Sequence, residues 1–203
     1  CNLWSGYARD RERDAARHGA SCPLWCDTDF TKEGSTAYSL PELVEAITQL
    51  DETQCRFCVI TGGEPLLHID APLIKALHEK GYEIAVETNG TVALQKNCWD
   101  AESQQLLPPD WIACSPKLGQ QHLALEYFDE LKLVVPSYQP RDFQEFLLRQ
   151  RKHLRSGQLV PLLWLQPEDG PRLKESIQLA VTLALQDPAW RVGAQTHKLL
   201  NVE

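Results

Sequence analysis

Three cysteines near the start of the chain have the types and spacing to hold a reactive metal site. They are Cys1, Cys22 and Cys26, and Cys26 opens the run Cys-Asp-Thr-Asp-Phe. A structural zinc site needs four protein ligands, whereas an iron–sulfur cluster held by three thiolates keeps one iron free for chemistry. We therefore expect an iron–sulfur cluster, and the alternative is a zinc site completed by a His or Asp side chain.

The other cysteines lack ligand spacing. Cys55 and Cys58 resemble half of a zinc or redox site, but Cys58 stands in an apolar run and no second pair has matching spacing. We expect Cys58, Cys98 and Cys114 to be buried free thiols. Because we recognise no export signal in the sequence, disulfides are not expected.

Composition and charge limit the classes of function. The chain has 203 residues, of which 43% are hydrophobic and 24% charged, as in an ordinary globular domain. No apolar run reaches the roughly 20 residues needed to cross a bilayer. A net charge of −8 repels phosphate backbones. We therefore expect a single-domain, cytoplasmic protein that binds a small molecule, with no nucleic-acid partner and no membrane.

The chain divides into an irregular start and a regular remainder. Residues 1–38 are predicted to form a cluster-binding segment, in which residues 5–21 are an insertion between the first two ligand cysteines. The run Arg9–Arg17 mixes charges of both signs and predicts a solvated helix. Since the chain begins at Cys and contains no Met, we expect an N-terminal strand to be missing from it.

Strands and helices alternate from residue 39 to residue 203. Such alternation predicts parallel strands joined by right-handed crossovers. Because the carboxyl ends of parallel strands meet at one edge, the turns after the strands should converge on one rim, where α/β proteins carry functional groups. Helices are predicted at 40–50, 71–80, 140–155 and 171–186, strands at 56–61, 82–87, 111–115, 131–135, 159–166 and 191–194, and rim turns at 61–65, 87–90, 115–117 and 166–169.

A cluster with a free iron can chelate the amino and carboxylate groups of an amino acid. S-adenosylmethionine carries both groups beside a sulfonium that one electron can cleave, which gives a hydrogen-abstracting radical. Several motifs of this chain, taken in order, resemble the 7-carboxy-7-deazaguanine synthase family of radical S-adenosylmethionine enzymes. They are Cys1–Trp4, Cys22 with Cys26–Phe30, Thr61–Pro65, Glu87–Gly90, Ser115–Lys117, Leu165–Pro167 and Gln195–Lys198.

The chain departs from the family pattern in two places. Twenty residues separate Cys1 from Cys22 and three separate Cys22 from Cys26, so both gaps are wider than in most radical S-adenosylmethionine enzymes. Some members of the family share the long first gap. The family's Gln-Gly-Glu loop, which binds substrate, has no counterpart in this sequence.

The resemblance implies the metal sites and the catalytic residue. Cys1, Cys22 and Cys26 would hold a [4Fe-4S] cluster. Thr28 would bind Mg²⁺, and because a neutral hydroxyl is a poor sole ligand for a hard cation, substrate oxygens and waters would complete the octahedron. Glu87 would be the catalytic residue.

Two further sets of contacts follow from the same resemblance. Thr61, His197 and Glu203 would contact the substrate, Glu203 through the terminal carboxylate. Gly63 would allow close backbone approach to the methionine amino group. The full set implied for S-adenosylmethionine is Gly63, Glu64, Ser115, Pro116, Lys117, Gln166, Pro167, Glu168 and Asp169.

The resemblance also implies an architecture and a reaction. The fold would be an incomplete, TIM-like (β/α) barrel of the radical S-adenosylmethionine type. A 5′-deoxyadenosyl radical would rearrange 6-carboxy-5,6,7,8-tetrahydropterin to 7-carboxy-7-deazaguanine with loss of ammonia, and S-adenosylmethionine would be regenerated. A homodimer and a reductase or flavodoxin-type electron donor would be its partners. The alternatives are another radical enzyme, such as a glycyl-radical-enzyme activase, and a non-enzymatic zinc-stabilised binding module.

Overall fold

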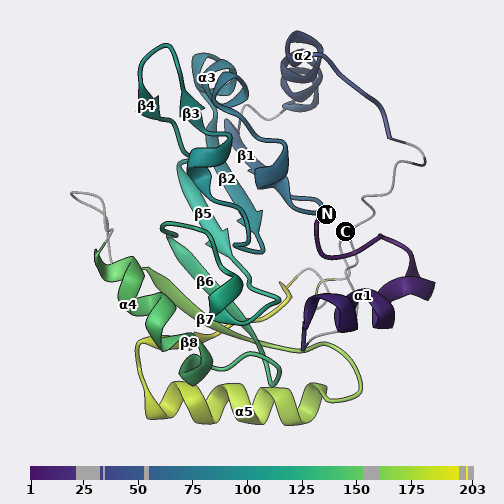
Figure 1. Cartoon of the computed structure of the whole chain (residues 1–203), viewed down its shortest axis with the longest axis vertical. Coiled ribbons are helices and arrows are strands. Elements are labelled where there is room, and N and C mark those ends of the chain that lie inside the picture. The colour runs from purple at the N-terminus through teal and green to yellow at the C-terminus, as the bar shows by residue number, and fades with distance from the viewer. Residues whose placement is uncertain (22–32, 34, 53–54, 153–160, 197–199, 201–203) are drawn as a thin grey trace.

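A six-stranded parallel sheet runs through the molecule, with helices gathered along it (Figure 1). The computed structural model describes residues 1–21, 33, 35–52, 55–152, 161–196 and 200. The strands are β1 (Phe57–Ile60), β2 (Glu83–Thr88), β5 (Trp111–Cys114), β6 (Glu130–Val135), β7 (Leu162–Pro167) and β8 (Trp190–Val192), in the spatial order β1-β2-β5-β6-β7-β8.

All neighbouring strands of this sheet pair in parallel. The six strands expected from the sequence are therefore present and parallel, each within a few residues of its predicted bounds. In the chain, a two-stranded antiparallel hairpin follows β2 and precedes β5, and it was not predicted. It pairs β3 (Trp99–Asp100) with β4 (Gln105–Leu106). Strands of two residues are too short to show the alternating pattern by which strands are recognised.

The predicted helices are also present in the described residues. They are α2 (Leu40–Leu50), α3 (Ala71–Glu79), α4 (Gln144–Lys152) and α5 (Leu173–Gln186), with short 3-10 turns η2 (Pro65–Leu67), η3 (Leu94–Lys96), η4 (Gln120–His122) and η5 (Pro140–Phe143) between elements. Local chemistry sets their ends. The backbone N–H of Ser39 donates to Glu42 at 2.8 Å in a capping box, and Asp70 accepts from Leu73 N at 2.9 Å.

The two faces of the sheet differ in character, because side chains alternate along each strand. One face is buried against α3, α4 and α5, which contribute Ile74, Phe146 and Ala180 to a single core. Its strand residues are fully buried: Ile84, Val86, Ile112, Cys114, Leu131, Leu133 and Leu165.

The opposite face is more open. On β1, Phe57 and Val59 point to this side and are 46% and 49% exposed. The register places Glu87, Ala113 and Glu130 in one row across it. With β1 and β8 unpaired to each other among the described residues, the sheet does not close. This architecture agrees with the expected partial barrel, whose open face is the concave side.

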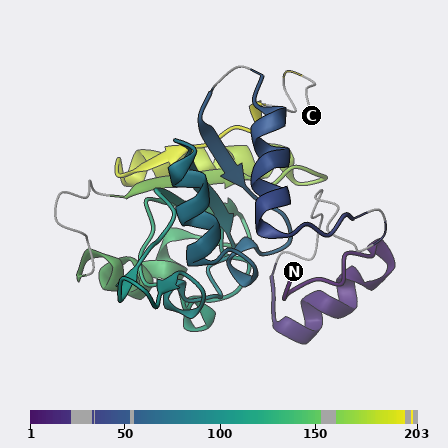
Figure 2. The same cartoon turned by 90° about the horizontal axis from the view of Figure 1, so that it is seen from above.

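The N-terminal segment forms η1 (Ala8–Asp10) and α1 (Arg11–His18), which stand beside the sheet in Figure 2. The predicted solvated helix is therefore present, but it is not solvated throughout. Asp14 is 6% exposed and accepts the backbone N–H of Ser5 at 2.8 Å, and Ala15 is 4% exposed. No described helix is long and apolar enough to cross a membrane.

The cysteines outside the predicted cluster are free in the structure. Cys98 and Cys114 are buried, as expected, and burial raises the pKa of the Cys98 thiol to about 11. Cys58 is only half-buried, because β1 lies at the edge of the sheet, and Cys55 is exposed. The CxxC pair therefore shows no sign of a closed metal site.

Candidate active site

The rim predicted from the sequence is formed where the parallel strands end. Since all six strands run the same way, the segments after β1, β2, β5 and β7 leave the sheet at one edge. Backbone hydrogen bonds between neighbouring strands continue up to this edge of the sheet. Ser115 N donates to Thr88 O at 2.8 Å and Glu168 N donates to Val135 O at 3.0 Å. The predicted convergence is confirmed.

The first of the predicted cluster cysteines, Cys1, lies against the loop after β1. A Cβ atom built on Gly63 would come within 2.5 Å of Cys1 N and 2.7 Å of Cys1 Cβ, so only a hydrogen fits there. Cys1 is a free, half-buried thiol whose Sγ accepts the backbone N–H of Leu3 at 3.5 Å. The chain thus brings together a predicted cluster ligand and a predicted S-adenosylmethionine contact.

Asn2 connects the same segment to the loop after β2. Its Oδ1 accepts from Nδ2 of Asn89 at 3.1 Å, and its Nδ2 donates to Thr91 Oγ1 at 2.7 Å. Asn89 Oδ1 in turn accepts the backbone N–H of Thr91 at 3.0 Å. Cys1 is therefore held on two sides, by Gly63 and by this asparagine pair.

Glu64 joins the loops after β1 and β2. The side chain is 2% exposed. Its Oε1 accepts from Thr88 Oγ1 at 2.7 Å and from Leu66 N at 3.1 Å, while Oε2 accepts from Asn89 N at 2.7 Å. Burial raises the pKa of Glu64, and the donated hydrogen bonds counter part of that rise. Both oxygens serve this network, so its expected contact with S-adenosylmethionine stays a prediction.

The loop after β2 requires glycine at position 90. Gly90 has φ +78°, and a Cβ atom there would lie 2.8 Å from Cys114 Sγ. Both the left-handed backbone and the close approach exclude a side chain. The loop that carries Asn89 therefore packs directly against Cys114 at the buried end of β5.

The loop after β5 carries a polar pair on the rim. Lys117 Nζ donates to Ser115 Oγ at 2.7 Å, and Tyr138 Oη donates to the Lys117 carbonyl. Pro116 between them is buried. Ser115 and Lys117 are half-buried, so this predicted segment presents a hydroxyl and an ammonium group at the strand end.

The loop after β7 is built differently. Glu168 is 5% exposed and accepts from Arg172 twice, from Nη2 at 2.6 Å and from Nε at 3.2 Å. Gln166 lies beside Gly193, where a Cβ atom would meet its Oε1 at 2.9 Å. Pro167 is buried and Asp169 is exposed. All members of this predicted segment are thus at the rim, but Glu168 is engaged within its own loop.

Glu87 points to the concave face and pairs with a residue that sequence reasoning missed. Lys132 Nζ on β6 lies 2.8 Å from Glu87 Oε1 and 3.6 Å from a Glu130 oxygen. The Glu87 side chain is 50% exposed and that of Lys132 is 29% exposed. A lone lysine between Leu131 and Leu133 was a signal that could have been read from the sequence.

Of the predicted substrate contacts, Thr61 lies at the rim and is exposed. Several other predicted site residues lie outside the described residues. Among the residues that the structure describes, no group of three or more His, Cys, Asp or Glu side chains could hold a metal ion. The predictions that fall outside the described ranges are Cys22, Cys26, Thr28, His197 and Glu203.

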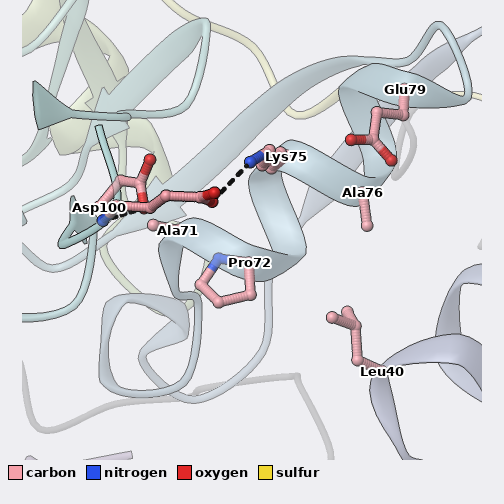
Figure 3. A pocket seen from close by; sticks show the side chains of 8 residues that line it. Leu40, Ala71, Pro72, Lys75, Ala76, Glu79 and Asp100 are labelled. Carbon is pink, nitrogen blue, oxygen red and sulfur yellow. Dashed lines mark hydrogen bonds and ion pairs between the residues drawn. The ribbon is translucent and has the colours of Figure 1, made fainter.

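An open pocket of about 330 Å³ lies away from the rim, between α2, α3 and the β3–β4 hairpin (Figure 3). Leu40, Pro72 and Ala76 line its apolar side. Lys75 and Glu102, which also line the pocket, form an ion pair at 3.2 Å. None of its lining residues belongs to the predicted site.

Known proteins resemble this chain in both sequence and fold. The chain is 39% identical over its whole length to a 7-carboxy-7-deazaguanine synthase of Bradyrhizobium diazoefficiens and 35% identical to that of Burkholderia multivorans, and it spans 85% of each relative. The crystal structure of QueE from Escherichia coli matches 83% of this chain and 77% of its own, with a TM-score of 0.54 at 23% identity. No family model matches.

The sequence likeness to both relatives covers the whole chain, and the structural likeness covers 83% of it. The structural match supports the open parallel α/β fold. The sequence matches run through all of the motifs from which the resemblance was first drawn. The chain is an enzyme that belongs to the 7-carboxy-7-deazaguanine synthase family.

Proposed function

We propose that this chain converts 6-carboxy-5,6,7,8-tetrahydropterin to 7-carboxy-7-deazaguanine, with loss of ammonia, in queuosine and 7-deazapurine biosynthesis. The observation that carries the proposal is the match to enzymes of that name over 100% of the chain at up to 39% identity. The convergence of the motif-bearing loops on one rim supports it independently.

The first segment fits the role of a cluster site. Cys1 has a free thiol, and a backbone N–H already faces its sulfur. Such hydrogen bonds are one way in which proteins tune cluster potential. Cys1, Cys22 and Cys26 would hold a [4Fe-4S] cluster. Together, cluster and S-adenosylmethionine supply hydrogen-abstracting radical chemistry, for which no side chain suffices.

The rim loops supply complementary contacts for S-adenosylmethionine. Gly63 would contact the methionine amino group through its backbone, and its missing Cβ atom lets Cys1, a proposed cluster ligand, lie against the same loop. Ser115 and Lys117 offer a hydroxyl and an ammonium group to ribose or carboxylate oxygens. Gln166 has one amide donor weakly placed on the Pro167 carbonyl at 3.4 Å, so it is free to turn toward a ligand. Glu64 and Glu168 would act by fixing the backbone of their loops.

The substrate would lie over the concave side of the sheet. Glu87 there is the acid or base within reach of a bound pterin. We place Thr61, His197 and the terminal carboxylate of Glu203 around the same substrate. Thr28 would bind Mg²⁺, whose remaining ligands would be substrate oxygens and water.

The same proposal covers partners and place of action. A reductase or flavodoxin-type protein would deliver the electron, and the enzyme would act as a homodimer in the cytoplasm. The net charge of −8 favours a free small molecule over a nucleic acid as substrate. The family match leaves a zinc-stabilised module and a glycyl-radical-enzyme activase without support.

Turnover by the reconstituted enzyme tests the proposal. The protein is reconstituted anaerobically with iron and sulfide, and then incubated with dithionite, S-adenosylmethionine, Mg²⁺ and 6-carboxytetrahydropterin. We expect 7-carboxy-7-deazaguanine and ammonia in equal amounts, with S-adenosylmethionine not consumed. A cluster-loaded enzyme that cleaves S-adenosylmethionine without forming this product would refute the substrate, and one bound zinc without sulfide would refute the radical chemistry.

A further inference from the structure

The concave face carries a charged pair that reaches across an intervening strand. Glu87 is on β2 and Lys132 on β6, and β5 runs between them. Neighbouring strands lie roughly 4.8 Å apart, so the two side chains must extend toward each other over β5. The β5 residue in the row of Glu87 is Ala113, whose small side chain leaves room for the crossing.

The ammonium group of Lys132 lies between two carboxylates. It is 2.8 Å from Glu87 and 3.6 Å from Glu130, and the register places these two acids on either side of Ala113. Without the lysine, two like charges would face each other across one strand. The lysine therefore fixes where the Glu87 carboxylate points.

Stability is a poor reason for this arrangement. The Glu87 side chain is 50% exposed, and exposed ion pairs add little to folding free energy. A long lysine between two leucines in the middle of β6 also loses rotamer freedom when it is held. The pair faces the side of the sheet where the loops of the candidate active site converge. Because holding the lysine costs conformational entropy and adds little stability, we expect the pair to serve the function of the site.

We infer that Lys132 is a positioning residue that holds the carboxylate of Glu87 in place for the reacting substrate. This inference rests on the proposed function, in which Glu87 is the catalytic residue. Lys132 acts through Glu87 and does not itself contact the substrate. Arginine can replace it in part, because a guanidinium also donates to carboxylates, whereas methionine cannot.

A kinetic double-mutant cycle tests this role. Glu87→Gln is expected to lower kcat by about 100-fold and Lys132→Met by about tenfold, the latter being the loss of one charge-assisted hydrogen bond. KM should change little, and Lys132→Arg should recover most of kcat. The double variant should be no slower than Glu87→Gln alone. Multiplicative losses, or a KM effect without a kcat effect, would overturn the inference.

Lys75 provides the matched control. It also forms an exposed ion pair, with Glu102 at 3.2 Å, but on α3 away from the rim. Lys75→Met removes the same charge by the same substitution and should leave kcat and iron content unchanged. A similar kcat loss in Lys75→Met would assign the Lys132 effect to surface charge and overturn the inference.

A second readout does not depend on turnover. Competitive acetylation of the holoenzyme, followed by peptide mass spectrometry, measures how accessible each lysine amine is. In Glu87→Gln the labelling rate of Lys132 should rise severalfold over that of Lys75, because the ion pair is gone. An unchanged rate would show that the contact is absent and overturn the inference, whereas absence of deazaguanine product from wild-type enzyme would count against the proposed function alone.

Discussion

Two buried glutamates, Glu64 and Glu168, lie at opposite ends of the rim and receive their hydrogen bonds from different parts of the chain. Glu64 receives its hydrogen bonds from Thr88 and Asn89, on the neighbouring strand's loop. Glu168 receives its own from Arg172, four residues further along. The first glutamate joins two strands, and the second only closes its own loop. Similar burial, with 2% of Glu64 and 5% of Glu168 exposed, therefore does not mean similar structural importance.

The largest effect is expected from Glu64→Ala. The substitution leaves three buried donors, on Leu66, Thr88 and Asn89, without an acceptor. We expect a loss of about 3 kcal/mol in the free energy of unfolding, measured by urea denaturation. Glu168→Ala is the matched control. If both variants lost the same stability, the contrast between the two glutamates would be wrong.

Gly90→Ala tests the β2 loop from its other side. A left-handed backbone and a Cβ atom 2.8 Å from Cys114 Sγ should together cost about 2 kcal/mol. Gly81 has a similar φ of +83° with nothing within 4 Å, so Gly81→Ala should cost only about 1 kcal/mol. Thermal or urea unfolding of the two variants separates strain from crowding, and equal losses would rule out the crowding.

Asn2→Ala should weaken retention of the proposed cluster more than it weakens the stability of the fold. It removes the bonds to Asn89 and Thr91, which are partly exposed, so we expect a stability loss of about 1 kcal/mol. Because Cys1 is the adjacent residue, the cluster should be lost more readily. The measurement is iron per chain after gel filtration. Full iron retention would show that Gly63 alone suffices to place Cys1.

Glu168→Gln should have the smallest effect on stability, about 0.5 kcal/mol. Arg172 is 46% exposed, and water can replace the lost charge-assisted bond. The amide still accepts one hydrogen bond from the guanidinium. A loss above about 2 kcal/mol in urea denaturation would mean that the negative charge of Glu168, and not only its hydrogen bonding, holds this loop.

Glu64 should also make the stability of the fold depend on pH. Burial raises the pKa of Glu64, so the folded protein holds this proton more tightly than the unfolded chain does. The contribution of Glu64 is therefore fully present below its ordinary value of 4.5 and decreases as the pH rises through the folded pKa. Glu64→Gln should remove this slope, as measured by unfolding between pH 4 and pH 8; a slope that persisted would have to come from other groups.

The contrast also shows what the sequence could predict. The alternation of apolar runs and turns located all six strands and the rim, because burial on a parallel sheet imposes continuous apolar runs. It could not predict which oxygen of Glu64 accepts from which strand, since that depends on the distance between loops in space. The pairing of Glu87 with Lys132 likewise depends on the order of the strands in space, although the isolated lysine between two leucines could have been noticed in the sequence.

Other residues lay beyond local pattern altogether. The β3–β4 hairpin has strands of two residues, which are too short for an alternating pattern to repeat. The burial of Asp14 in a helix dense with charge depends on the backbone N–H of Ser5, which no helical periodicity reveals. Cys58 is half-buried because β1 is an edge strand, and the position of a strand in the sheet cannot be predicted from the sequence of that strand alone.

Hydrogen exchange tests most directly whether Glu64 makes the two loops one unit. The backbone N–H groups of Leu66 and Asn89 both donate to this carboxylate. In the wild-type protein they should exchange at the same slow rate, and in Glu64→Gln both should exchange faster together, while Glu168→Gln leaves them unchanged. Independent exchange of the two amides in the wild-type protein would contradict the account.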